Sequence, residues 1–500
     1  MNATSTTSSA SDSISTAEID ASCRVPLFTI FVSGAVWLVV ASVFGLIASI
    51  KFHAPGFLSD CPLLTYGRVH PVATNALVYG FAVQAGLGVA LWIIARMGGA
   101  KVAQPWLIAV GAKLWNFGLT IGVIGILAGD STGFENLEIP RYGVVFLSMG
   151  YLLIAFFTLV TLHNRKNRDL RPSQWFLLAA LFWFPWIYFT ATYLLLSHSP
   201  IRGMTQAVLA WWYSGNLHFV WFGLVGLGAL SHFFDEAKSF GCTRSRNLAL
   251  FIFWTVILFA SWSGIPPSAP VPAWMPALST VARVLMIIPV LALLVDFNQL
   301  IETWKFGPSK LSPMETRTAL GSLPDYGDSG FVGFGIIAFL MSWAMVSISS
   351  IPAIAAVTNF TWFTVAQSQL NVFGFFSMFM FFWIYAIVPQ VTGIQWPCAK
   401  SVRRHFWLAA IGIVLIVLPL ALGGLIEGFN WHNTKMSNVD VAKNALNFLR
   451  ISTLGELLIL AGNLMLLGNL VGLSVRYYKI HFVPVYQQAT VELKPVEAKP

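Results

Sequence analysis

Repeated runs of about 20 apolar residues constrain this chain more than any other feature. A helix that crosses a membrane needs about 20 such residues, because each adds 1.5 Å and the hydrocarbon core is about 30 Å thick. Of the 500 residues, 57% are apolar and only 10% are charged. A soluble protein carries about a quarter charged residues, so this chain lacks the charge to cover a water-facing surface. We therefore predict an all-α membrane protein.

The runs predict twelve membrane-spanning helices. Their expected ranges are 27–50, 71–95, 106–128, 142–162, 174–196, 206–234, 248–264, 272–296, 330–356, 362–391, 405–426 and 450–475. With an even number of spans, both termini share one side, and that side holds 20 Lys and Arg residues against 7 on the other. Because cytoplasmic loops are rich in Lys and Arg, we expect a multi-pass protein of the bacterial inner (plasma) membrane with both termini in the cytoplasm.

The ends of the chain differ from its middle. Residues 1–26 are expected to form a disordered cytoplasmic segment, since the first 22 are rich in Ser, Thr and Ala and lack the basic start of a signal peptide. The membrane domain is predicted over 27–476, and 477–500 is a polar tail that we expect to be flexible. The net charge of +9 follows from the loops between spans, so no nucleic-acid partner is expected.

Setting aside residues at span ends, four His, Lys, Arg or Glu side chains fall inside predicted spans, and each is a functional hypothesis by default. His218 could instead be a neutral imidazole that is hydrogen-bonded to a neighbouring helix. Lys113 lies near a span start, where its ammonium can reach the interface. Arg283 and Glu456 could pair with each other or with the charges of a ligand. Structural pairing is the expectation for these last two.

Several motifs give the chain a resemblance to a known family. They include LTYGRVHPVATNALVYGF at 64–81, WWYSGNLHFVWFGLVGLGAL at 211–230 and VAQSQLNVFGFFSM at 365–378, with further stretches at 113–135 and 262–274. Their order on the second, third, sixth, seventh and tenth spans resembles subunit I of the haem-copper oxidases, most closely the cbb3 type. The resemblance implies a twelve-helix bundle that holds two haems and one copper ion. It also implies cytochrome c oxidase activity and electron transport in a respiratory chain.

The positions of the family's six histidine ligands hold other residues in this chain. Carried over one by one, they fall on Ala73, Gly215, Pro266, Pro267, Gln367 and Gln369. Alanine, glycine and proline offer no side-chain donor, and a carboxamide lacks the imidazole nitrogen that binds iron. The chain also has no C-x-x-C-H motif for covalent haem. We therefore predict no haem, no metal and no catalytic residue.

Two histidines lie near the lost positions. His70 precedes Ala73 by three residues and His218 follows Gly215 by three, so each shares a helix face with the lost position. Three residues along a helix correspond to about 4.5 Å, too far to reach the same metal. We expect these histidines to form at most a residual polar site, together with Lys113, Arg283 and Glu456.

The acidic loop 129–141 carries Asp130, Glu135 and Glu138 on the side predicted to be periplasmic. A solvated loop is the expectation. The alternative is an attraction for a basic partner such as a cytochrome c.

The sequence favours a degenerate paralogue, a pseudoenzyme that keeps the oxidase fold and serves a respiratory complex as a structural or regulatory subunit. Whether the protein is an enzyme stays open, because an active haem-copper terminal oxidase that takes electrons from cytochrome c is one alternative. A secondary transporter is another, and the former haem space could hold a quinone or a lipid. The expected partners are the lipid bilayer and other respiratory subunits or cytochrome c.

Overall fold

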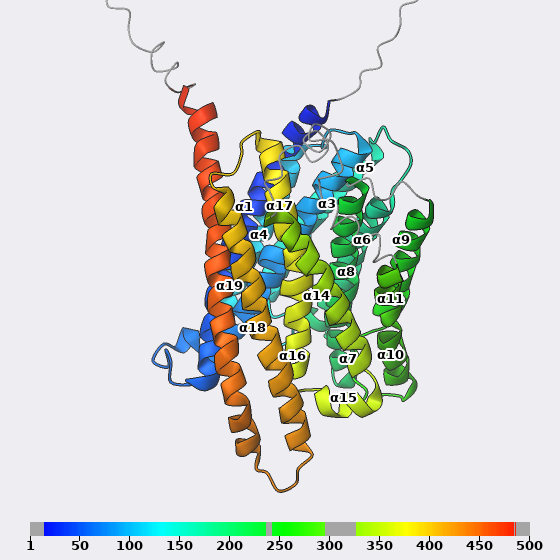
Figure 1. Cartoon of the computed structure of the whole chain (residues 1–500), viewed down its shortest axis with the longest axis vertical. Helices are drawn as coiled ribbons and strands as arrows, with labels where there is room; N and C mark the ends of the chain where they lie inside the picture. The colour runs from blue at the N-terminus through cyan, green and yellow to red at the C-terminus, as the bar shows by residue number, and fades with distance from the viewer. Residues whose placement is uncertain (1–14, 237–242, 296–326, 485, 487–500) are drawn as a thin grey trace, which may run out of the picture.

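The computed structural model describes residues 15–236, 243–295, 327–484 and 486. Within these ranges the chain forms helices and turns and no strand, which confirms the predicted all-α class. Figure 1 shows long helices running side by side along one axis, with the first and last described residues at the same end of the bundle. An even number of crossings places the two ends of a chain on one side in this way.

The first half of the chain forms the following helices, of which η1 is a 3₁₀ turn: α1 (Thr16–His53), η1 (Pro62–Leu64), α2 (Tyr66–Asn75), η2 (Ala76–Ala82), α3 (Val83–Gly98), α4 (Pro105–Ala128), α5 (Arg141–His163), α6 (Pro172–Leu196), α7 (Met204–Gly215), η3 (Asn216–Trp221) and α8 (Phe222–Glu236). The second half forms α9 (Thr243–Thr255), η4 (Val256–Ala260), α10 (Trp274–Leu285), α11 (Ile287–Val295), α14 (Gly327–Ser349), α15 (Pro352–Thr358), α16 (Trp362–Gln369), η5 (Leu370–Ser377), α17 (Met378–Thr392), α18 (Ala399–Trp431) and α19 (Asn438–His481). Consecutive helices joined without a break act as one span.

Eleven described helices are long and apolar enough to cross a membrane. The shorter apolar helix Arg246–Ala260 matches the seventh predicted span and brings the number to the predicted twelve. Proline and glycine interrupt this region before Trp274, which explains why its helix is short.

The N-terminal boundary of the membrane domain differs from the prediction. Helix α1 begins at Thr16, so residues 16–26 are helical and not disordered. Ser15 caps the helix by accepting a hydrogen bond from the backbone N–H of Glu18, and Asp20 forms an ion pair with Arg96 on α3. Capping and tertiary pairing therefore order a stretch whose composition alone predicts disorder. Residues 1–14 and 487–500 lie outside the described residues, and α19 continues through 477–481 of the predicted tail.

Two spans form the centre of the bundle, Tyr66–Gly98 and Trp362–Thr392, and both are enclosed by other helices along their most apolar stretch. Each contains a π-helical segment, η2 or η5, and π-helical segments also occur as η3 and η4. Such segments are rare and often mark functional sites, because an extra residue in a turn re-aims the side chains beside it. The π-helical segments therefore direct attention to the side chains beside them as candidates for a functional site.

Candidate ligand cavity

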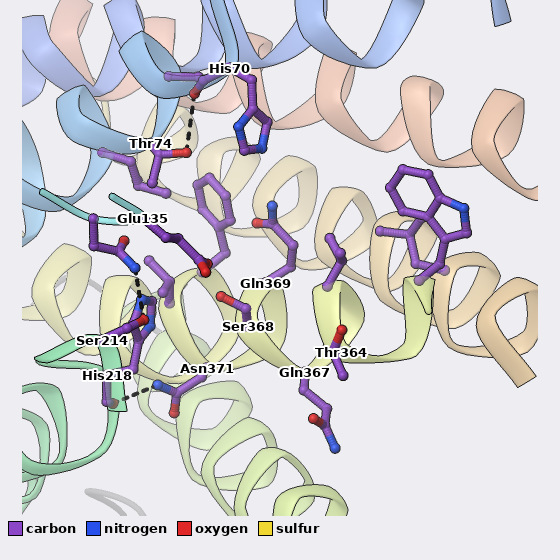
Figure 2. A pocket seen from close by; sticks show the side chains of 18 of the residues that line it. His70, Thr74, Glu135, Ser214, His218, Thr364, Gln367, Ser368, Gln369 and Asn371 are labelled. Atoms are coloured by element: carbon purple, nitrogen blue, oxygen red, sulfur yellow. Dashed lines mark hydrogen bonds between the residues drawn. The ribbon is translucent and has the colours of Figure 1, made fainter. Parts of the chain in front are cut away.

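A cavity of about 650 Å³ lies inside the bundle. Residues of α1, α2, α7, α10, α16, α18 and α19 line it, together with the loop residues Glu135 and Asn136 (Figure 2). These segments include the beginnings of α2, α16 and α19, so the cavity lies toward the end of the bundle opposite the termini. Its volume is within the range of about 300–1,000 Å³ typical of ligand sites.

Five of the six positions predicted to replace metal ligands line this one cavity. They are Ala73, Gly215, Pro266, Gln367 and Gln369, and they come from four separate segments of the chain; Pro267 is not among the lining residues. Each of the four segments lies next to one of the π-helical segments described above. The motif comparison and the folded structure thus select the same region independently.

The two glutamines face opposite sides of α16, as residues two apart on a helix should (Figure 2). Gln367 donates a hydrogen bond from Nε2 to Oγ of Ser349 on α14 at 2.7 Å. Gln369 points toward the side of the cavity that holds His70 and Thr74. One glutamine is therefore tied to a neighbouring helix, whereas the other faces the open space.

Gly215 is packed so closely that no side chain fits without a shift. An added Cβ would lie 2.7 Å from the carbonyl oxygen of Ser263 and 3.1 Å from Cα of Gly264. Gly264 has φ +124°, a conformation reserved for glycine, and its own Cβ position lies 2.4 Å from the carbonyl oxygen of Trp211. Backbone therefore fills the space where a side chain at 215 would begin.

His70 and His218 both line the cavity but from different helices, and Figure 2 shows them on separate walls. The His70 ring packs 5.4 Å from the Tyr66 ring, and the His218 ring packs edge-on to Phe222 at 5.4 Å. Nδ1 of His218 is enclosed and has no hydrogen-bond partner. Across the part of the chain that the structure describes, no three His, Cys, Asp or Glu residues are grouped to hold a metal ion.

Of the charged residues predicted within spans, two line the cavity and one does not. Arg283 and Glu456 both line the cavity, but within the described ranges the ion pairs are Arg96–Asp20 and Lys101–Glu18, so the predicted pairing of Arg283 with Glu456 is wrong. Arg283 lies on α10 and Glu456 on α19, which stand at opposite edges of the bundle in Figure 1. Lys113 is exposed on α4 and does not line the cavity.

The acidic loop folds inward, so the expectation of a fully solvated loop is wrong for its second half. Glu138 is buried, and its Oε2 accepts a hydrogen bond from Nδ2 of Asn75 at 2.8 Å. Desolvation raises the pKa of Glu138 to about 7, against the opposing effect of the Asn75 hydrogen bond. Burial also raises the pKa of Glu135, which lines the cavity.

A polar network that the sequence did not single out holds this loop against the helices. The Tyr79 hydroxyl donates to the carbonyl oxygen of Asn136 and lies 2.7 Å from the Tyr213 hydroxyl. Nδ2 of Asn136 donates to Oγ of Ser214 at 2.9 Å. Tyr79 and Tyr213 lie inside the motifs at 64–81 and 211–230, so their polar groups within apolar runs were the available signal.

Comparisons with known proteins agree with this architecture of a many-helix membrane bundle. Residues 26–458 match the family model of Cytochrome C and Quinol oxidase polypeptide I. The chain therefore belongs to the haem-copper oxidase subunit I family.

Individual relatives are distant. The chain is 22% identical over 453 residues to a cytochrome c oxidase subunit 1 homolog of Azorhizobium caulinodans, with 87% of this chain and 79% of that protein covered. It is 22% identical over 406 residues to the cbb3-type cytochrome c oxidase subunit CcoN1 of Stutzerimonas stutzeri, with 79% and 82% covered. A heme-copper terminal oxidase dimer solved by cryo-EM superposes with TM-score 0.66 at 12% identity, covering 90% of this chain and 84% of that one. At that identity the structural match shows the fold alone.

Proposed function

We propose that this protein is a degenerate member of its family, a membrane subunit that has kept the oxidase fold and lost its redox cofactors. The observation that supports the proposal is the set of side chains at the cavity: one alanine, one glycine, one proline and two glutamines occupy positions that the motifs predict to correspond to the family's histidines. Fold and chemistry are separable, because a bundle held by packing does not need its ligands to remain folded.

The family's two haems and copper ion do not fit the donors that this cavity presents. Iron and copper in such sites are held by imidazole nitrogen, and the cavity offers imidazoles only at His70 and His218. These two lie on separate walls, and backbone atoms fill the space at Gly215. No step of oxygen reduction is therefore derived for this chain.

The role we propose is structural or regulatory, within a respiratory complex of the bacterial inner membrane and with both termini in the cytoplasm. Family membership supports this role, because the relatives are named as oxidase subunits. The aromatic residues exposed on the outer helices, among them Trp106, Trp254 and Trp407, suit contact with lipid or with a neighbouring subunit.

A visible absorption spectrum and a metal analysis of the purified full-length protein test the proposal. We expect no haem absorption band and less than stoichiometric iron and copper. The double variant Ala73→His, Gln369→His serves as a matched comparison, because it places two new imidazoles on cavity walls. A stoichiometric haem in the unaltered protein, with oxygen consumption on addition of a reductant, would overturn the proposal and restore an active terminal oxidase.

A further inference from the structure

Arg283 is a cation inside the bundle that forms no ion pair with any other residue that the structure describes. It lies on α10 within the candidate span Trp274–Leu294 and lines the cavity. Its Nε atom is enclosed and makes no hydrogen bond, and none of the ion pairs among the described residues includes it. A guanidinium keeps its charge in proteins, so Arg283 places on the cavity wall a positive charge that forms no ion pair with either carboxyl group of the lining, Glu135 or Glu456.

An unbalanced charge within a membrane protein is costly, and such residues almost always face an interior cavity and pair there with another group. Glu456 does not pair with Arg283. It lies beside α1, where its Oε2 is 3.6 Å from the Cβ position of Gly45, on the opposite side of the bundle from α10. Among the described residues no carboxyl group therefore pairs with Arg283, and a ligand from outside the chain can supply that partner.

The side chains that line the cavity indicate the chemistry of the rest of that partner. Most of the lining is apolar or aromatic, including Phe52, Leu77, Val78, Phe219, Phe373 and Leu420. His218 adds a ring nitrogen, Nδ1, that is enclosed and without a partner. A planar guanidinium favours the paired oxygens of a carboxylate or phosphate, while the apolar lining favours a hydrocarbon chain.

We infer that the cavity binds an amphiphilic anion, a carboxylate or phosphate attached to an apolar chain, with the anionic group on Arg283 and the chain along the apolar wall. The inference rests on the proposed function, because a haem would occupy the same space. The cavity that we propose to have lost its cofactors would thus be a site for a lipid-like ligand.

Binding of oleate to the purified full-length protein in an uncharged detergent tests the inference, with oleyl alcohol as a probe of the same length and no charge. We expect oleate to raise the unfolding temperature and oleyl alcohol to have little effect. Arg283→Gln should weaken oleate binding at least tenfold, equivalent to about 1.4 kcal/mol. Arg283→Lys should weaken it less, since the charge remains but the planar pair of donors is lost. Lys113→Gln, which removes an exposed cation outside the cavity, should bind as the unaltered protein does.

A second variant protects the test if Arg283→Gln does not fold. Ala73→Phe leaves the guanidinium in place and fills part of the cavity, so it should also lose oleate binding. Equal stabilisation by oleate and oleyl alcohol would overturn the inference, as would unchanged oleate binding in both Arg283→Gln and Ala73→Phe. Equal loss in Lys113→Gln and Arg283→Gln would overturn it as well.

Two further probes identify the source of the anion. Dioleoyl phosphatidate binding more tightly than oleate would assign a phosphate headgroup, and the reverse order would assign a carboxylate. Binding of acetate or inorganic phosphate alone, with neither lipid bound, would overturn the amphiphilic assignment. The spectrum described above separates the two proposals: a haem would overturn the proposed function, whereas a haem-free protein without anion selectivity would overturn only this inference.

Discussion

The two central spans have contrasting halves. Their first halves, in α2 and α16, line the cavity, whereas their second halves, α3 and α17, pack large rings into the core. In that packed half, the Trp383 ring lies 5.9 Å from Trp92 and 5.0 Å from the stacked ring of His232. We expect the packed half to hold the bundle together, so that residues of the cavity half can change without loss of the fold. Residues that line the cavity and residues that pack the core are thus separated along the same helices.

Trp383→Ala should disrupt the packing of the packed half and give the largest loss of stability. Removing a buried tryptophan leaves a void among Trp92, His232 and Phe382, and such changes cost about 3–5 kcal/mol. Gln369→Ala, in the cavity half of the same span, should change stability by less than about 0.5 kcal/mol. Unfolding of the two variants in mixed detergent measures the difference. Equal destabilisation would contradict the division between the halves.

Glu138 lies in the loop whose residues Glu135 and Asn136 line the cavity, and it should make stability depend on pH. Its pKa is raised from the ordinary 4.5 to about 7 in the folded protein, so between these values the unfolded carboxyl ionises while the folded one keeps its proton. The free energy of unfolding is therefore highest, as far as Glu138 is concerned, below pH 4.5. It falls as the pH rises to about 7, by on the order of 3 kcal/mol at 1.36 kcal/mol per pH unit.

The control for this prediction is Glu138→Gln, which should lose most of the decline when unfolding is measured at pH 5 and pH 7.5. A smaller decline should remain, because burial raises the pKa of Glu135 as well. An unchanged pH profile in Glu138→Gln would show that other groups set the dependence.

The sequence predicted the all-α membrane fold well, because the length of an apolar run follows directly from the thickness of a bilayer. It also identified five positions that the structure brings to one cavity, since motif order fixes which spans face inward. It could not predict that Arg283 and Glu456 lie on opposite walls, because pairing depends on how helices are arranged around the axis. The burial of Glu138 was missed for a similar reason, since a partner such as Asn75, 63 residues away, is invisible in local composition.

Gly215→Ala, on α7 at the wall of the cavity, should lower stability by an intermediate amount. The new Cβ would meet the carbonyl oxygen of Ser263 at 2.7 Å, and backbone must shift to relieve this contact, at a cost of about 1–3 kcal/mol. Ala73→Val, which adds volume toward the cavity, should cost about 0.5 kcal/mol or less. Thermal unfolding of both variants checks the order. The reverse order would mean that the cavity wall at α2 is more rigid than the contact between α7 and the 263–264 backbone.

The smallest expected change in stability is the difference between substituting one and the other of the two glutamines of α16. Gln367→Leu removes a hydrogen bond to Ser349 Oγ, and interhelical hydrogen bonds in membrane proteins contribute about 0.6 kcal/mol on average. Ser349 keeps its own hydrogen bond to the carbonyl oxygen of Val346 at 3.2 Å, so no donor is left unsatisfied and the cost should stay near that value. Gln369→Leu should be neutral in the absence of ligand, because Gln369 faces the cavity. If Gln369→Leu proved the more damaging change in ligand-free protein, Gln369 rather than Gln367 would be a fixed part of the helix packing, and the cavity half would not be as free to vary as we propose.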